Sequence, residues 1–138
     1  MKKIITLTVV LLLAGSSFAR PQKKVNNPYQ EFWETYKTAV SKRDVDTIAR
    51  LSQFPIGMSY GIPPIRTKAQ LTKRYRQLFN EQTDAAACFT KSKPEVDTSN
   101  PAQFSVACPD AAGNEVVLYH FKYTKTGWKF VGLDNLNE

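Results

Sequence analysis

The chain has 138 residues, a formal net charge of +7 and 42% hydrophobic residues, a composition typical of a globular protein rather than a disordered or multi-span membrane protein. That length fits a single domain. One His and two Cys cannot supply the four ligands of a usual His/Cys zinc site, and the sequence has neither a P-loop nor a dinucleotide-binding glycine motif. We therefore predict no metal site and no cofactor.

The first 19 residues have the pattern of a secretory signal peptide. Lys2 and Lys3 precede an apolar run over residues 4–14, and small residues at Ser17 and Ala19 fit cleavage after Ala19. The run is shorter than the ~20 residues that a membrane-spanning helix needs, so no transmembrane segment is expected after cleavage. Cleavage leaves 119 residues with a net charge of +5. We expect an exported protein, periplasmic or extracellular, with no nucleic-acid partner.

A first helix is predicted after a polar, basic leader over residues 20–27. Asn27 and Pro28 suit the N-cap and the first helical position, and Gln30 is placed for a capping-box contact. The apolar residues that follow have helical spacing and form one stripe: Tyr29, Phe32, Trp33, Tyr36 and Val40.

Two more helices are predicted before residue 85, where the spacing of the apolar residues changes from helical to alternating. Asp44 can cap a short helix that ends near Gln53, and Thr67 with Gln70 forms a capping box at the start of the third. Residues 54–65, dense in Pro and Gly, favour an edge strand or an irregular crossing. The third helix carries four apolar residues on one face: Leu71, Tyr75, Leu78 and Phe79.

From residue 85 onward the apolar residues alternate, which predicts strands over residues 86–91, 103–108, 115–124 and 128–133. Residues 109–114 and 125–127 are rich in turn formers. The last three strands are therefore expected to form an antiparallel meander.

The predicted elements carry a characteristic series of core and turn residues: Phe32-Trp33, Tyr36, Ala39-Val40, Ile48-Ala49, Leu51, Phe54-Pro55-Ile56, residues 65–71, Arg74-Tyr75, Leu78-Phe79, residues 127–130 and Asp134-Asn135. In this order they resemble small exported members of the nuclear-transport-factor-2-like (NTF2-like) superfamily, over residues 28–135. The resemblance implies a single α+β domain over residues 28–138, in which three N-terminal helices pack on a curved antiparallel sheet of the cystatin-like type. It implies a cone with a pocket at its open end. The superfamily includes isomerases, dehydratases, transport factors and secretion-system components, so the resemblance specifies the fold and leaves the activity undecided.

Cys88 and Cys108 are the only cysteines, and an oxidising compartment favours a structural disulfide between them. The alternative is a reactive thiol, although neither Cys lies in a C-x-x-C motif or beside a His.

His120 and Asp134 are the two candidate catalytic residues, both weak. His120 is the only histidine, and Asp134 follows the last strand near the expected cone mouth. Tyr119 and Phe121 define the strand face predicted to point inward, so His120 is expected to point outward next to Lys122. A structural or solvated histidine is the simpler interpretation.

Aromatic residues are the candidate pocket lining, with tyrosine hydroxyls as the polar points of an apolar cavity. The alternative is that they only fill the core, which a domain this small needs. The candidate residues are Trp33, Tyr36, Tyr60, Tyr75, Tyr119, Phe121, Tyr123 and Trp128.

A cluster of cations on the third helix is either a solvated face or a docking ridge for an anionic partner, which could be an envelope polymer, a membrane surface or an acidic protein. No acidic residue interrupts it before Glu81. Its members are Arg66, Lys68, Lys73, Arg74 and Arg76.

Three functions follow from these observations. The preferred one is a non-enzymatic exported binding domain for a small apolar ligand or a protein partner. The second is a small-molecule isomerase or lyase that uses the cone pocket. The third is a self-associating, homodimeric accessory subunit of a cell-envelope assembly.

Overall fold

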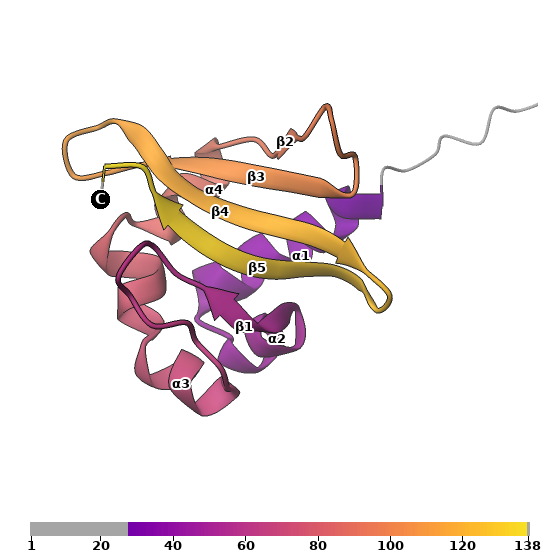
Figure 1. Ribbon diagram of the computed structural model, residues 1–138, viewed down its shortest axis with the longest axis horizontal. Coiled ribbons are helices and arrows are strands. Elements are labelled where there is room, and N and C mark those ends of the chain that lie inside the picture. Colours follow the sequence, from indigo (N-terminus) through magenta and orange to yellow (C-terminus); the bar gives the residue numbers. More distant parts are fainter. Residues whose placement is uncertain (1–27, 138) are drawn as a thin grey trace, which may run out of the picture.

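The computed structural model describes residues 28–137 and shows helices packed against one face of a five-stranded sheet (Figure 1). The predicted α+β class is confirmed. The predicted signal peptide and leader, with the N-cap at Asn27, lie outside the described residues. In chain order the elements are α1 (Pro28–Lys42), α2 (Val45–Arg50), β1 (Ser52–Gly57), α3 (Lys68–Lys73), the π-helical segment η1 (Gln77–Glu81), α4 (Ala85–Lys91), β2 (Glu95–Val96), β3 (Gln103–Pro109), β4 (Glu115–Thr124) and β5 (Gly127–Asn135).

The helix α1 carries the predicted apolar stripe into the core. Trp33, Tyr36 and Val40 are buried, and Tyr29 and Phe32 are half-buried against the same cluster. The helix ends where Arg43 takes a φ of 54° and the backbone N–H of Asp44 donates to Ala39. This turn brings the Asp44 carboxylate to the start of α2, where it accepts the backbone N–H of Thr47 at 3.1 Å.

The predicted third helix starts where expected, after the Thr67 cap. The structure divides it into two segments, α3 and η1. The Thr67 hydroxyl accepts the Gln70 N–H, and the Gln70 side chain accepts the Arg66 N–H at 2.7 Å, so the cap works in both directions. The helix α3 ends at Lys73, and the chain resumes a wider coil as η1. All four apolar residues predicted for the inner face are buried: Leu71, Tyr75, Leu78 and Phe79.

The strand predicted over residues 86–91 is wrong, because this segment is the helix α4. The Asp84 carboxylate accepts the Ala87 N–H at 3.1 Å and caps a run of three alanines, the residue with the highest helix propensity. Ala85, Cys88 and Phe89 are buried at helical spacing, so the helix packs one face against the core. With α4 added, the count of three helices is also wrong for the described residues.

The sheet has the order β1-β5-β4-β3-β2, and β3, β4 and β5 form the predicted antiparallel meander. The expectation of a wholly antiparallel sheet is wrong, because β1 pairs with β5 in parallel and the open sheet is mixed. Adjacent antiparallel strands need only a turn between them, whereas the long chain segment between β1 and β5 allows either direction.

β1 is the predicted edge strand and contains Pro55, a residue that edge strands tolerate. Its free side is partly covered, because the backbones of Ile56 and Ile65 exchange hydrogen bonds of 2.8 and 3.0 Å.

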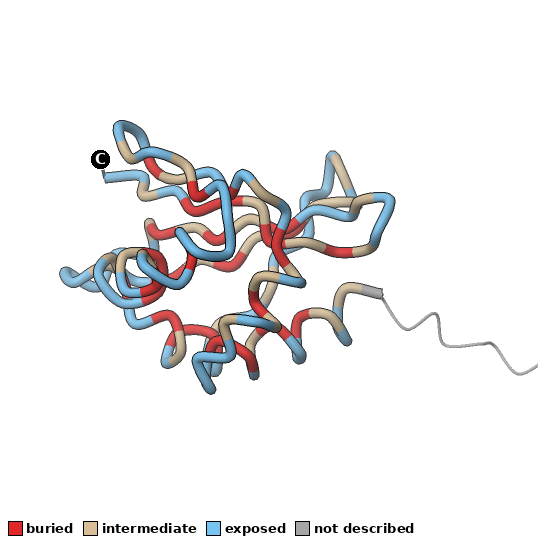
Figure 2. Tube along the Cα trace, turned by 90° about the horizontal axis from the view of Figure 1, so that it is seen from below, coloured by how far each residue is buried: buried red, intermediate tan, exposed pale blue. Residues whose placement is uncertain are grey.

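Alternation along the strands separates the two faces of the sheet, and the buried residues lie between sheet and helices (Figure 2). Along β4, Val117, Tyr119 and Phe121 are buried, whereas His120 is half-buried and Lys122 is exposed. The inner face of β4 is therefore the aromatic one, as predicted.

Candidate functional site

Six of the eight candidate pocket residues are packed side by side inside the domain. Phe121 is central: its ring centroid lies 4.6 Å from that of Phe104 and 5.1 Å from that of Tyr36. Ring-to-ring packing of this kind occupies the space that a cone cavity would need. The six buried residues are Trp33, Tyr36, Tyr75, Tyr119, Phe121 and Trp128.

Two of the buried tyrosine hydroxyls bind the backbone. Tyr119 donates to the carbonyl of Leu78 at 2.7 Å, and Tyr75 donates to the carbonyl of Val40 at 3.0 Å. Burial raises the pKa of Tyr36, Tyr75 and Tyr119, so the neutral phenols persist at ordinary pH. The Tyr119 hydroxyl thus joins β4 to η1, and the Tyr75 hydroxyl joins the segment after α3 to α1.

The other two candidate pocket residues lie at the surface. The side chain of Tyr60 is 95% exposed in the loop after β1, and that of Tyr123 is 52% exposed near the end of β4. Tyr123 contacts the edge of Trp128, with 5.4 Å between ring centroids.

His120 and Asp134 lie on neighbouring strands and pair with each other. The His120 Nε2 is 3.0 Å from a carboxylate oxygen of Asp134, and their side chains are 36% and 55% exposed. The pair lies on the outer face of the sheet, where His120 and Lys122 border a shallow cavity of about 520 Å³. The expected outward direction of His120 agrees with this placement.

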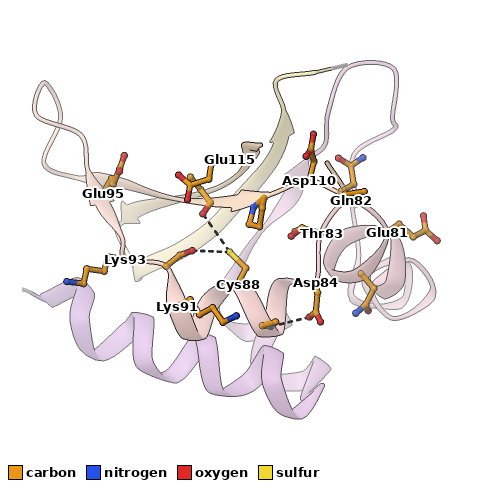
Figure 3. Close-up of a pocket in the computed structure, with 16 residues that line it drawn as sticks. Glu81, Gln82, Thr83, Asp84, Cys88, Lys91, Lys93, Glu95, Asp110 and Glu115 are labelled. Atoms are coloured by element: carbon orange, nitrogen blue, oxygen red, sulfur yellow. Dashed lines mark hydrogen bonds between the residues drawn. The ribbon is translucent and has the colours of Figure 1, made fainter. Parts of the chain in front are cut away.

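A polar cleft of about 720 Å³ lies between the η1–α4 segment and the β3–β4 hairpin (Figure 3). Residues 80–84 form one side, and α4 with the segment that follows it contributes Ala87, Cys88 and residues 91–93. Glu95 from β2, Glu115 from β4 and residues near the end of β3 complete the lining.

Acidic side chains predominate in this cleft of a basic protein. Of the five carboxylates, Asp84 and Asp110 hold structural hydrogen bonds, Asp84 as the cap of α4. Among residues 28–137, Glu81, Glu95 and Glu115 form no ion pair. The charged lining consists of Glu81, Asp84, Glu95, Asp110 and Glu115 with Lys91 and Lys93.

The predicted disulfide is confirmed and lies at the base of the cleft. Cys88 of α4 and Cys108 of β3 are bonded, and both are buried. The hydroxyl of Ser92 lies 3.2 Å from the Cys88 sulfur, and because a disulfide sulfur has no hydrogen, Ser92 is the donor (Figure 3). The bond fixes α4 to the sheet and so sets the width of the cleft.

Asp110 orders the hairpin at the upper side of the cleft. One carboxylate oxygen accepts the N–H groups of Ala112 and Asn114, each at 2.9 Å, and the other accepts the Asn137 side-chain amide. The hydrogen bond from the Asn114 N–H is the main cause of a lowered pKa at Asp110.

Acid is expected to destabilise the fold through three aspartates. The Thr47 hydroxyl lowers the pKa of Asp44, and the Ser99 hydroxyl lowers that of Asp97, as the Asn114 N–H does for Asp110. A folded-state pKa below the unfolded value contributes stability at pH above about 4, and this is lost as pH falls through the folded-state pKa. The melting temperature should therefore be constant from pH 6 to 5 and fall below pH 4. Asp110→Asn should reduce the fall, and an unchanged melting temperature at pH 2.5 would contradict this account.

The five basic candidates lie at the surface around α3. Arg66, Lys68, Lys73 and Arg76 are exposed, whereas Arg74 is half-buried and donates to the Gln77 side chain at 2.8 Å. Lys68 also forms an ion pair with Asp46. The structure brings these cations together at one end of the molecule, away from the His120–Asp134 pair.

Residues 57–61 have the spacing G-x-S-x-G, which in α/β hydrolases marks a nucleophile on a tight strand-to-helix turn. The structural context differs, because the chain leaves β1 into a loop and α3 begins only at Lys68. The Ser59 hydroxyl is buried and makes no hydrogen bond within the described residues, so no base is placed to activate it, and His120 pairs with Asp134 on the outer face of the sheet. The motif therefore does not mark a nucleophile turn.

Membrane-spanning helices and metal-binding clusters of side chains are both absent from the described residues. No helix within residues 28–137 is long and apolar enough to cross a membrane. In the same range, no group of three or more His, Cys, Asp or Glu side chains is arranged to hold a metal ion.

Solved structures with an NTF2-like arrangement of helices and sheet match this chain at low sequence identity. A protein of the NTF2-like family from Streptomyces avermitilis is 13% identical, with a TM-score of 0.45, and the match covers 78% of this chain and 91% of that one. An NTF2-like protein with a cystatin-like fold from Novosphingobium aromaticivorans is also 13% identical, with a TM-score of 0.45 over 78% and 80% of the two chains.

A protein of unknown function from Pectobacterium atrosepticum, of the DUF3225 family, is 12% identical with a TM-score of 0.47 over 82% and 90%. No activity, substrate or partner of this chain follows from these matches. No family model and no curated protein matches the sequence.

The polar cleft is the feature that sequence reasoning missed. Its walls come from segments that lie far apart in the chain, and Glu81, Glu95 and Glu115 share no spacing that marks a site. One local signal was present, since Asp84 before three alanines predicts a helix start and so one of the elements that form the cleft.

Proposed function

We propose that this protein is an exported, non-enzymatic binding domain whose ligand occupies the cleft beside the Cys88–Cys108 disulfide. The proposal rests on where the structure has open space. The polar cleft holds about 720 Å³, whereas aromatic rings pack the interior. A volume of this size suits a small ligand or a short peptide segment. The signal-peptide pattern and the disulfide both fit an oxidising, extracytoplasmic location.

The chemistry of the lining favours a ligand with positive charge. The lining contains five carboxylates and two amines. Glu81, Glu95 and Glu115 form no ion pair in the described structure, so they can accept hydrogen bonds from a ligand without breaking one. A concave surface lined mainly by one sign of charge concentrates ions of the opposite sign. An amine or a basic peptide segment is therefore the expected class of ligand.

Binding is favoured over isomerase or lyase chemistry by the groups that line the cleft. None of the described lining residues is a His or a Tyr. Together with a carboxylate, these are the groups that most readily exchange protons with a substrate near neutral pH. His120 and Asp134, the two catalytic candidates, lie outside this cleft.

The proposal is tested by titrating spermidine into the isotopically labelled protein and following backbone amide shifts. Shifts should concentrate in residues 80–95 and 107–115. The double variant Glu95→Gln/Glu115→Gln should weaken binding about tenfold, because two exposed charge contacts of ~0.7 kcal/mol each are lost. The matched control, Glu31→Gln/Glu34→Gln on α1, changes the net charge equally and should bind as the wild type does. Equal weakening in both double variants, or shifts confined to the aromatic interior, would overturn the proposal.

A further inference from the structure

The surface around α3 has a charge pattern opposite to that of the cleft. Residues 47–80 contain six cations and no acidic residue, and Arg66, Lys73 and Arg76 are exposed there without an ion pair in the described structure. Lys68 is paired with Asp46, but its side chain remains 58% exposed. The helix α3 itself has no acidic residue beside these cations, and the acidic side chain next to it, Asp46 of α2, is the partner of Lys68.

The loop between β1 and α3 carries an exposed tyrosine, Tyr60. The Ile62 N–H donates to the carbonyl of Ser59 at 3.0 Å, which closes a turn with Tyr60 and Gly61 at its corner. Gly61 has a φ of +79°, a value that favours glycine at this turn position. Tyr60 is therefore 95% exposed at an ordered turn, and Pro63 beside it is exposed as well.

The loop and the cationic helix are physically connected. The Arg74 guanidinium donates to the carbonyl of Pro64 at 3.3 Å, and the loop is closed at its base by the Ile56–Ile65 backbone pair. In Figure 1, α3 lies at the lower edge and the loop between β1 and α3 rises on the left to the height of the β5 label, whereas the β3–β4 turn beside the cleft lies at the upper left.

We infer that this basic surface, made of the Tyr60 turn with Arg66, Lys68, Lys73 and Arg76, docks the protein reversibly on an anionic lipid bilayer. Lys and Arg side chains near such a surface each gain Coulomb energy that salt screens. A tyrosine has an apolar ring and a polar hydroxyl, which suits the interfacial layer between headgroups and acyl chains. Docked in this way, the domain would hold the acidic cleft on the side away from the membrane.

A bilayer fits this surface better than an acidic protein or a polyanion does. Neither of the two cavities described above is lined by residues 57–79. Flexible cations around one protruding aromatic residue suit a flat, deformable layer of anionic headgroups. The inference is independent of the ligand proposed for the cleft.

The test is vesicle co-sedimentation of the chain as recovered from an expressing cell, with its mass measured to define the N-terminus. Binding is expected to vesicles of phosphatidylcholine with 30% phosphatidylglycerol and not to phosphatidylcholine alone, and it should fall steeply between 50 and 300 mM salt. Lys73→Glu/Arg76→Glu should reduce binding at least tenfold, and Tyr60→Ala about threefold.

Matched controls separate this surface from general charge attraction. Lys122→Glu/Lys125→Glu changes the net charge equally on the β4 side, and Tyr123→Ala removes the other exposed tyrosine; both should bind as the wild type does. Equal loss in the two charge variants, binding to soluble dextran sulfate with none to vesicles, or no binding at all would overturn the inference.

Discussion

Replacement of Phe121 by alanine is expected to lower the free energy of unfolding by about 3–5 kcal/mol, the usual cost of removing a buried phenylalanine ring. Phe121 is 1% exposed, and its ring lies between those of Phe104 and Tyr36, with centroids at 4.6 and 5.1 Å. Trp33 of α1 and Phe130 of β5 contact it from other sides, at 5.8 and 5.4 Å. Because the rings come from separate elements, no single side chain can move in to fill the cavity.

Urea denaturation followed by tryptophan fluorescence measures this loss. Small domains have only about 5–15 kcal/mol of stability in all, so Phe121→Leu, expected to cost far less, is measured alongside in case the alanine variant does not fold. Lys122→Ala on the opposite face of β4 is the matched control and should change stability by no more than about 0.5 kcal/mol. A loss below 1 kcal/mol in Phe121→Ala would show that the interior is loosely packed and would reopen the cone pocket as a ligand site.

Removal of the disulfide by Cys88→Ala/Cys108→Ala is expected to destabilise the fold by about 3 kcal/mol. The two cysteines are 20 residues apart, and the crosslink limits the conformations of the unfolded chain that this loop can adopt. For a domain of this size, such a loss lowers the melting temperature by roughly 10–15 °C. The wall formed by α4 should also loosen, so spermidine binding in the cleft should weaken in the same variant.

Chemical reduction provides the control for the cysteine variant. A reductant should lower the melting temperature of the wild type by a similar amount and leave the double variant unchanged. Intact mass should rise by two hydrogen atoms on reduction of the disulfide-bonded protein. Free thiols before reduction, or a wild-type melting temperature insensitive to reductant, would contradict a structural role for the bond.

The local signals in the sequence predicted most of the helices and the meander. Caps at Asp44 and Thr67, the apolar stripe of α1 and the turn formers around β4 each involve residues within a few positions of one another. Interactions of that range depend little on the rest of the fold, which is why these elements could be predicted. The prediction failed at α4, because a short apolar run fits a strand as readily as a helix and the cap at Asp84 starts a helix.

For the candidate residues, too, the sequence predicted local properties but not contacts between distant positions. Their types were informative: the aromatic residues were predicted either to line a pocket or to fill the core, and six of them pack in the interior. Their partners were not predictable, since the ring contacts of Phe121 and the hydrogen bond from Tyr119 to Leu78 join positions far apart in the chain.

The sequence by itself determined the α+β class, the disulfide pair, the inward face of β4 and the basic character of α3, because composition, periodicity and local capping are properties of short segments. Only the tertiary structure decided that β1 runs parallel to β5, that aromatic rings pack the interior, and that the open space is an acidic cleft. Each of these depends on which distant segments meet. The packing of the whole core determines which distant segments meet. Each short segment of the sequence contributes only part of that packing.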